Sequence, residues 1–308
     1  MRGYDAYQSP YAFQQIPLVP MSSPRLALWP IAALLGSLVS LCAGTSFAKS
    51  LFPVVGAEGT TTYRLVFAAL MLMLWRRPWR HSWHWPDLPP LALYGINLGL
   101  MNLLFYRALE TIPFGLAVAI EFTGPLAVAI VASRKPLDYL WVLLAMAGLG
   151  LLLPWPGASD PLHPVGMGFA LAAGVCWAIY IVLGQRVAGR YGAMATPMGM
   201  LMAALLVTPF GWSVAGTALF NPEWLGAGLA VALLSSAIPY SLEMYALQHL
   251  PKYTFSLLLS LEPAVGALAG WWVLSESLSL GQICAIGLII LASMGSAYAM
   301  QRPAPTPV

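Results

Sequence analysis

FYRALETIPFGLAVAIEFTGPLAVAI, at residues 105–130, resembles EMYALQHLPKYTFSLLLSLEPAVGAL, at residues 243–268. Both stretches are apolar, both carry two prolines twelve residues apart, and both place one glutamate shortly before the second proline. Aligning Pro113 with Pro251 also aligns Ala108 with Ala246, Leu109 with Leu247, and Pro125 with Pro263. The second half of the chain therefore repeats the first.

Apolar stretches that are long enough to cross a bilayer fill the chain. A hydrocarbon core of about 30 Å requires about 20 apolar residues of helix. Ten stretches approach or reach this length: 26–46, 57–75, 88–108, 112–132, 138–153, 165–184, 194–214, 224–246, 253–274 and 279–299. The pattern predicts an all-α membrane protein with ten transmembrane helices.

Basic residues lie almost entirely in every second gap between these stretches. Eleven of the fourteen lie on one side if both termini are cytoplasmic: Arg2, Arg25, Arg76, Arg77, Arg80, Arg134, Lys135, Arg186, Arg190, Lys252 and Arg302. The other gaps contain only Lys49 and Arg107, and Arg64 lies inside the second stretch. Because Lys and Arg concentrate in cytoplasmic loops, we expect an N-in, C-in orientation.

The composition excludes several classes of protein. Only 8% of the residues are charged and 59% are hydrophobic, whereas a soluble domain has about 25% charged residues. The net charge of +3 reflects the basic loops, and no nucleic-acid partner is expected. The three cysteines lie inside apolar stretches without paired spacing, so they predict neither a metal site nor a redox site. We therefore expect no metal and no cofactor.

The repeat also predicts the topology. Five helices per repeat is an odd number, so the two halves must cross the membrane in opposite orientations. We expect inverted repeats at 25–155 and 164–300, a disordered cytoplasmic tail at 1–24 and a short cytoplasmic tail at 301–308. Inverted repeats recur in secondary transporters, where the substrate site lies near the midplane of the bilayer between the halves. A channel can also be built in this way.

Two acidic residues fall near the middle of repeat-related stretches. Glu121 precedes Pro125 by four positions, and Glu262 directly precedes Pro263. A carboxylate at the centre of a bilayer costs about 2.5–3.5 kcal/mol on insertion scales, and each proline removes a backbone donor and breaks the helix. The combination indicates a polar cavity, with Glu121 and Glu262 as candidates for substrate binding and proton exchange. Alternatively, each acid is protonated or hydrogen-bonded to a neighbouring helix.

Further polar and aromatic residues are candidates for the same cavity. Arg64 either binds a substrate carboxylate or pairs with an acid such as Glu58 or Glu121. Lys49 lies just past the outer end of the first stretch, within reach of the interface. Glu243 and the nearby Tyr240 lie toward the cytoplasmic end of the eighth stretch, lining an inner vestibule or the interface. The remaining candidates lie inside the sixth stretch beside a glycine: Trp177 and Tyr180.

Five motifs resemble one family of transporters. They are GTSFAKSLFPVVG at 44–56, EFTGPLAVAI at 121–130, GVCWAIYIVLGQR at 174–186, IPYSLEMYAL at 238–247 and SLEPAVGALAG at 260–270. The chain resembles the ten-helix EamA-type transporters of the drug/metabolite transporter superfamily over about residues 26–300. Within that group it is most similar to the threonine and homoserine exporters of the bacterial inner membrane.

The resemblance implies export of small amino acids, such as threonine, homoserine and analogues, by proton antiport and alternating access. Its partners would be the amino acid, protons and the lipid bilayer, and a homodimer is left open. The alternatives are an exporter of other metabolites or of aromatic and drug-like compounds, and a passive channel. An enzyme is not expected, because neither H-E-x-x-H nor G-x-S-x-G occurs. The motif G-x-x-x-x-G-K-[ST] is also absent, so pumping driven by ATP would need a partner.

Overall fold

The computed structural model describes residues 24–112, 114–152, 163–265 and 280–301. Every regular element within these ranges is a helix, so the all-α prediction is confirmed. The predicted tails lie outside these ranges, except that Pro24 and Gln301 belong to helices. Pro113 and residues 266–279, which include the end of the ninth apolar stretch, also lie outside them.

Helices occupy the described part of each apolar stretch. In chain order they are α1 (Pro24–Ala48), α2 (Phe52–Arg76), α3 (Leu88–Leu109), α4 (Phe114–Glu121), α5 (Thr123–Ala132), α6 (Pro136–Leu152), α7 (Pro164–Tyr191), α8 (Ala195–Ala215), α9 (Pro222–Ala232), α10 (Ile238–His249), α11 (Lys252–Leu258) and α13 (Leu280–Gln301). A π-helical segment, η6 (Leu233–Ala237), joins α9 to α10.

Among the described residues, four helical stretches are long and apolar enough to cross a membrane: Leu28–Arg76, Trp85–Leu109, Pro164–Phe220 and Pro222–His249. The first has 49 residues, or about 75 Å at 1.5 Å per residue, more than twice the thickness of a hydrocarbon core. It contains two helices, α1 and α2, which are joined by a 3-10 turn at Lys49–Leu51. The backbone leaves the helical conformation at Gly56, whose φ of 72° suits glycine.

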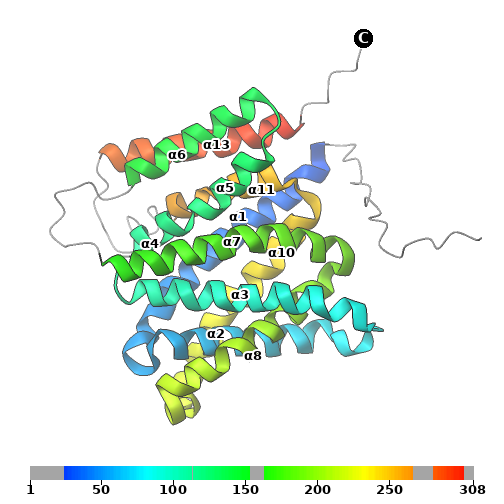
Figure 1. Ribbon diagram of the computed structural model, residues 1–308, viewed down its shortest axis with the longest axis vertical. Coiled ribbons are helices and arrows are strands. Elements are labelled where there is room, and N and C mark those ends of the chain that lie inside the picture. The colour runs from blue at the N-terminus through cyan, green and yellow to red at the C-terminus, as the bar shows by residue number, and fades with distance from the viewer. Residues whose placement is uncertain (1–23, 113, 153–162, 266–279, 302–308) are drawn as a thin grey trace, which may run out of the picture.

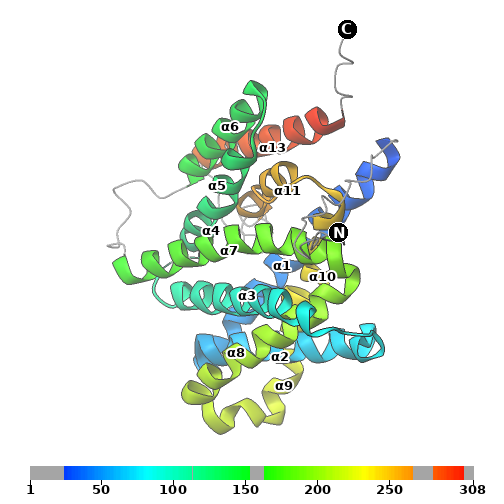
Figure 2. The ribbon, with the colours of Figure 1, turned by 45° about the vertical axis from the view of Figure 1, so that its right-hand side comes forward.

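The helices pack side by side in a bundle with two distinct edges (Figure 1). The pair α6 and α13 forms one edge, and α2, α8 and α9 form the other; Figure 2 shows the same order after a turn of the molecule. Between these edges α3 packs on α7, and α1 packs on α10. The short helices α4, α5 and α11 lie between this central group and the α6–α13 pair.

Two helices in the middle of the bundle are interrupted shortly before a proline. A turn at Phe122 separates α4 from α5, three residues before Pro125. Turns at Leu259 and Ser260 end α11, and helix resumes at Leu261–Val265 around Pro263. A proline cannot donate the backbone hydrogen bond that would continue the preceding turn. The first break therefore follows Glu121 directly, and the second lies just before Glu262.

Glycines bring the backbones of neighbouring helices into direct contact. A Cβ atom placed on Gly174 of α7 would lie 2.6 Å from the carbonyl oxygen of Glu121, and one on Gly124 would overlap the carbonyl oxygen of Gly174. On the other side of the bundle, a Cβ atom on Gly44 of α1 would lie 2.5 Å from the backbone nitrogen of Ser235. Small residues permit such close approach in membrane helices, and here they hold the broken helix of Glu121 against α7.

A side chain at Gly174 should therefore destabilise the bundle. We expect Gly174→Val to lower the free energy of unfolding by about 1–3 kcal/mol or more, because backbone atoms must move to admit it. Gly168→Val is the matched control on the same helix, since a Cβ atom there meets nothing within 4 Å. Unfolding of both variants in mixed micelles measures the difference, and equal stability would contradict the close contact.

Candidate functional site

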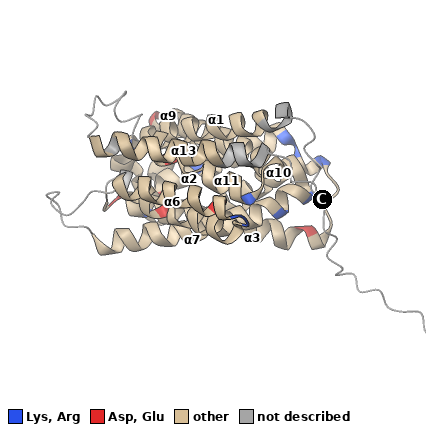
Figure 3. Ribbon diagram, turned by 90° about the horizontal axis from the view of Figure 1, so that it is seen from above, with Lys and Arg blue, Asp and Glu red and all other residues tan. Residues whose placement is uncertain are grey.

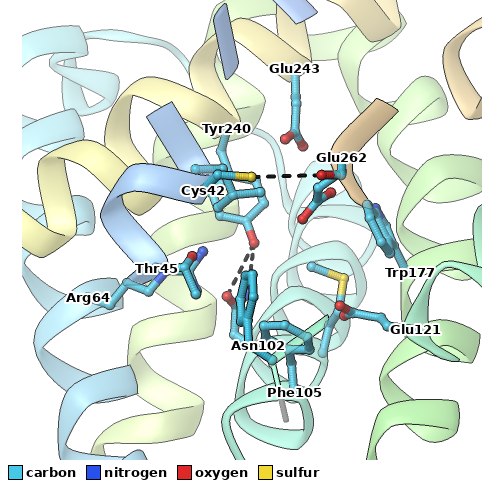
Figure 4. Close-up of a pocket in the computed structure, with 13 residues that line it drawn as sticks. Cys42, Thr45, Arg64, Asn102, Phe105, Glu121, Trp177, Tyr240, Glu243 and Glu262 are labelled. Carbon is cyan, nitrogen blue, oxygen red and sulfur yellow. Dashed lines mark hydrogen bonds between the residues drawn. The ribbon is translucent and has the colours of Figure 1, made fainter. Parts of the chain in front are cut away.

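A cavity lies in the centre of the bundle, beside the two helix breaks. The space between atoms there measures about 500 Å³, including the part that is open to solvent. Its lining comes from both halves of the chain: Leu41, Cys42, Thr45, Arg64, Met101, Asn102, Phe105, Phe114, Glu121, Trp177, Tyr240, Glu243 and Glu262. Figure 4 shows Arg64 and Thr45 on one side, Glu121 and Trp177 on the other, and Glu243 and Phe105 at opposite ends.

Glu121 and Glu262 both line this cavity, and both are buried. Their exposed fractions are 6% and 7%. Neither carboxylate makes a hydrogen bond or an ion pair with any residue of the described ranges, and Oε2 of Glu262 is buried without a partner. The nearby Cys42 Sγ donates to the backbone carbonyl oxygen of Glu262 at 4.0 Å and leaves the carboxylate of Glu262 without a partner among the described residues. The two acids are therefore free to interact with a molecule in the cavity.

Arg64 is held in the cavity wall by the π-helical segment. Its Nε atom donates to Ser236 Oγ at 2.7 Å, and its Nη2 atom donates to the carbonyl oxygen of Ser235 at 2.6 Å. The guanidinium carbon lies 5.2 Å from the ring centroid of Tyr106. Arg64 is 3% exposed and forms no ion pair within the described part of the chain. The alternative of pairing with Glu58 or Glu121 is thus wrong for this structure.

Glu58 has a different partner. Arg107 Nη2 lies 2.5 Å from Glu58 Oε1, and Arg107 also contacts Glu110 at 3.5 Å. This cluster joins the first turns of α2 to the end of α3 and lies outside the set of cavity-lining residues. The buried Glu58 is thus paired with Arg107 and does not line the cavity that Arg64 lines.

Glu243 also lines the cavity, and among the three acids its carboxylate accepts the most hydrogen bonds from described residues. Ser37 Oγ donates to its Oε1 atom at 2.9 Å, and the Tyr180 hydroxyl donates to its Oε2 atom at 3.1 Å. Glu243 lies on α10, Ser37 on α1 and Tyr180 on α7. The sequence left open whether Glu243 lines an inner vestibule or lies at the membrane interface. The structure favours the vestibule, because Glu243 is only 4% exposed.

Asn102 and Tyr240 form a hydrogen-bonded pair across the cavity. Asn102 Nδ2 lies 3.0 Å from the Tyr240 hydroxyl, which lies 3.2 Å from Asn102 Oδ1. Tyr240 follows Asn102 by 138 positions, the same spacing that separates Pro113 from Pro251. The two residues that the sequence repeat aligns are therefore in direct contact.

The remaining candidates lie at different distances from the cavity. Trp177 lines it and packs edge-on against Phe122, with the ring centroids 6.1 Å apart. Tyr180 lies behind the lining and contacts it through Glu243. Lys49 is exposed, and its Nζ atom lies 5.9 Å from the ring centroid of Phe114, which is a lining residue. The structure thus brings together Glu121, Glu262, Arg64, Trp177, Tyr240 and Glu243.

Several lining residues carried no distinctive sequence signal. Thr45, Asn102 and Phe105 lie inside apolar stretches where single polar or aromatic residues are common. The position of Asn102 could have been inferred from the repeat alignment, because its equivalent is Tyr240. The two serines that hold Arg64 depend on the π-helical segment, which the apolar pattern does not predict.

Comparison with known proteins decides the family. A model of the EamA-like transporter family matches residues 164–298. Threonine/homoserine exporter RhtA of Escherichia coli (strain K12) is 47% identical over 285 residues, which cover 92% of this chain and 97% of that protein. The chain belongs to the EamA-like transporter family. Together with its long apolar helices, this membership makes it a multi-pass membrane protein.

Other relatives of this EamA-family chain agree. RhtA of Salmonella typhimurium (strain LT2) is also 47% identical, with the same coverage. Uncharacterized transporter YwfM of Bacillus subtilis (strain 168) is 26% identical, over 73% of this chain and 78% of the relative. One solved crystal structure, 20% identical, has a TM-score of 0.64 and covers 90% of this chain and 99% of its own. That likeness shows a shared fold.

The contacts of Glu243 should contribute measurably to stability. We expect Ser37→Ala and Tyr180→Phe each to lower the free energy of unfolding by about 1–3 kcal/mol, because each leaves a buried carboxylate oxygen without its donor. The double variant should deviate from additivity, because both donors share one carboxylate. Unfolding in mixed micelles measures these effects.

The exposed residues Ser46 and Tyr139 provide the controls for these substitutions. Ser46→Ala and Tyr139→Phe remove the same hydroxyl groups away from the cavity. Losses of the same size in these controls would show that the hydrogen bonds to Glu243 do not matter.

Proposed function

We propose that this protein exports small amino acids, such as threonine, homoserine and their analogues, across the bacterial inner membrane by proton antiport. The observation that carries the proposal is the cavity, which combines one buried guanidinium with three buried carboxyl groups. An amino acid carries one carboxylate and one ammonium group. Arginine binds carboxylates well, and carboxylates accept charge-assisted hydrogen bonds from ammonium groups. The cavity is complementary to both ends of such a substrate.

The relatives support the choice of substrate. RhtA is named as a threonine and homoserine exporter, and the present chain covers nearly all of it at 47% identity. Thr45, Asn102 and the Tyr240 hydroxyl supply polar groups between Arg64 and the acids, suited to a hydroxyl-bearing side chain. The aromatic lining residues Phe105, Phe114 and Trp177 favour a second candidate, an exporter of aromatic amino acids or drug-like compounds.

We further propose ten transmembrane helices in two inverted repeats of five, with both termini in the cytoplasm. The helix contacts have the symmetry that such a repeat requires: α2 packs on α8 and α6 on α13, while the α1–α10 contact corresponds to the α7–α3 contact. The Asn102–Tyr240 pair supports an axis through the cavity. Lys and Arg gather toward the end of the bundle at which α13 ends (Figure 3), which supports a cytoplasmic location for that end.

The hydrogen bonds of Glu243 suggest how access alternates. Ser37, Glu243 and Tyr180 connect α1, α10 and α7 at one end of the cavity, so this end opens only when the bonds break. Phe105 and Phe114 line the cavity nearer the ends of α3 and α4 that face away from the basic loops. Rocking of one repeat against the other would close the aromatic end and release the Glu243 network.

Glu121 and Glu262 are the proposed coupling acids, because their carboxyl groups have no partner among the described residues. An acid without a fixed partner can exchange a proton with either side of the membrane as access alternates. A proton and a substrate ammonium group would compete for the same carboxylate, and this competition couples inward proton movement to outward substrate movement. Glu243, which has two fixed donors, is assigned to the closure instead.

Export by Gln variants of the two acids tests this proposal. Cells that overproduce the wild-type protein should export labelled threonine or homoserine, and dissipating the proton gradient should abolish concentrative export. Glu121→Gln or Glu262→Gln should reduce gradient-driven export by at least about tenfold yet retain exchange between two equal pools, because Gln keeps the size but not the exchangeable charge. Glu223→Gln, at an exposed position, is the control.

Each alternative gives a different result in this assay. Equal export with and without the gradient would indicate a passive channel, and preference for labelled tryptophan or phenylalanine would indicate the aromatic exporter. Wild-type gradient-driven export in both Gln variants would remove these acids from the mechanism.

A further inference from the structure

A second cavity lies at the end of the bundle that carries the basic loops. It lies where the end of α2 and one face of α10 approach the first turn of α8, and its space between atoms, including the part open to solvent, measures about 510 Å³. It is lined by Leu72, Arg76, Ala193, Thr196, Pro197, Ser241, Met244, Tyr245 and Gln248. None of these residues lines the central cavity. The proposed transport mechanism therefore does not use it.

The electrostatics of this second cavity favour an anion. Arg76 is its only charged lining residue, and it forms no ion pair within the described ranges. The guanidinium carbon lies 4.6 Å from the ring centroid of Trp75, which is 69% exposed. Exposed tryptophans are typical of the interface between the hydrocarbon and the lipid head groups. The positive charge is therefore held at head-group depth.

Thr196 supplies a second, independent feature of a binding site. Its side chain lines the cavity, is only 4% exposed, and makes no hydrogen bond to a residue that the structure describes. By contrast, Thr60 and Thr61 of α2 donate to carbonyl oxygens four residues earlier, at 2.7 and 2.8 Å. A hydroxyl at a cavity wall that has no protein partner can donate its hydrogen bond to a ligand or to water. The hydroxyl of Thr196 is thus available to a ligand oxygen.

Comparison with the first half shows what this region lacks. The residues 138 positions after Glu58 and Arg107 are Thr196 and Tyr245, and both line the second cavity. In the first half, the buried Glu58 is neutralised by Arg107. In the second half neither charge is present, and Arg76 faces the space from α2. Arg76 therefore has no acidic partner among the described residues of the region that corresponds to the Glu58–Arg107 ion pair of the first half.

We propose that this second cavity binds a phosphate group, with Arg76 and the hydroxyl of Thr196 as donors to its oxygens. Arginine and hydroxyl donors are well suited to phosphate oxygens. The exposed amide of Gln248 lies at the rim, and the Ser241 hydroxyl is already used in a bond to the carbonyl oxygen of Ala237 at 2.6 Å. The depth set by Trp75 indicates the head group of an anionic phospholipid as the source, and a free phosphate ion is the other source.

Native mass spectrometry of the purified full-length protein tests the site. Phosphatidylglycerol should remain bound to the wild type, whereas phosphatidylcholine, whose head group has no net charge, should bind at least about tenfold more weakly. Arg76→Gln and Thr196→Val should each weaken phosphatidylglycerol binding by about tenfold, because each variant loses one hydrogen bond to the phosphate. The bond lost in Arg76→Gln is charge-assisted. Arg80→Gln is the control, because Arg80 is exposed and lies outside the cavity lining.

A parallel titration with inorganic phosphate in detergent distinguishes the two sources. Thermal stabilisation of the wild type, but not of Arg76→Gln, by millimolar phosphate would support the site and assign it to a soluble anion. Stabilisation by phosphatidylglycerol alone would assign it to lipid. Equal binding by wild type, Arg76→Gln and Thr196→Val, or equal losses in Arg80→Gln, would overturn the proposal.

Discussion

Burial of ionisable groups within an apolar bundle is the constraint on which the rest of this structure depends. Three carboxyl groups and one guanidinium are each less than 10% exposed around a single cavity. Each would cost about 2.5–3.5 kcal/mol at the centre of a bilayer if it faced lipid. They are tolerated because they face one another across polar space and because hydrogen bonds fix two of them. Ser37 and Tyr180 donate to Glu243, and Ser236 accepts from Arg64.

Helix breaks and close glycine contacts in the backbone support this arrangement. Breaks before Pro125 and Pro263 end the helical turns beside Glu121 and Glu262, and the close contact of Gly174 with the carbonyl oxygen of Glu121 fixes the first break against α7. On the opposite side, Gly44 brings α1 onto the π-helical segment whose serines hold Arg64. Closely packed elements from both halves of the chain thus line the cavity. Arg64 and Glu121 come from the first half, and Glu243 and Glu262 come from the second.

The sequence predicted the helical class and most of the cavity, because costly residues in apolar stretches are easily recognised. Glu121, Glu262, Arg64, Trp177 and Tyr240 were all expected near the cavity, and all line it. The partner of Arg64 was not predictable, because it depends on a π-helical turn that places Ser235 and Ser236 beside α2. The positions of Lys49 and Tyr180, outside the lining, depend on helix rotation, which an apolar pattern leaves undetermined.

Shared use of a carboxyl group by the proton and the substrate is the central claim, and proton release on binding tests it most directly. Purified protein in weakly buffered detergent solution, just below the pH at which the cavity acids lose their protons, should release protons when threonine is added. A pH-sensitive dye would record acidification in the wild type and little in the Glu121→Gln, Glu262→Gln double variant. Binding of threonine to the wild type, seen by calorimetry across the pH range without any proton release, would contradict the account.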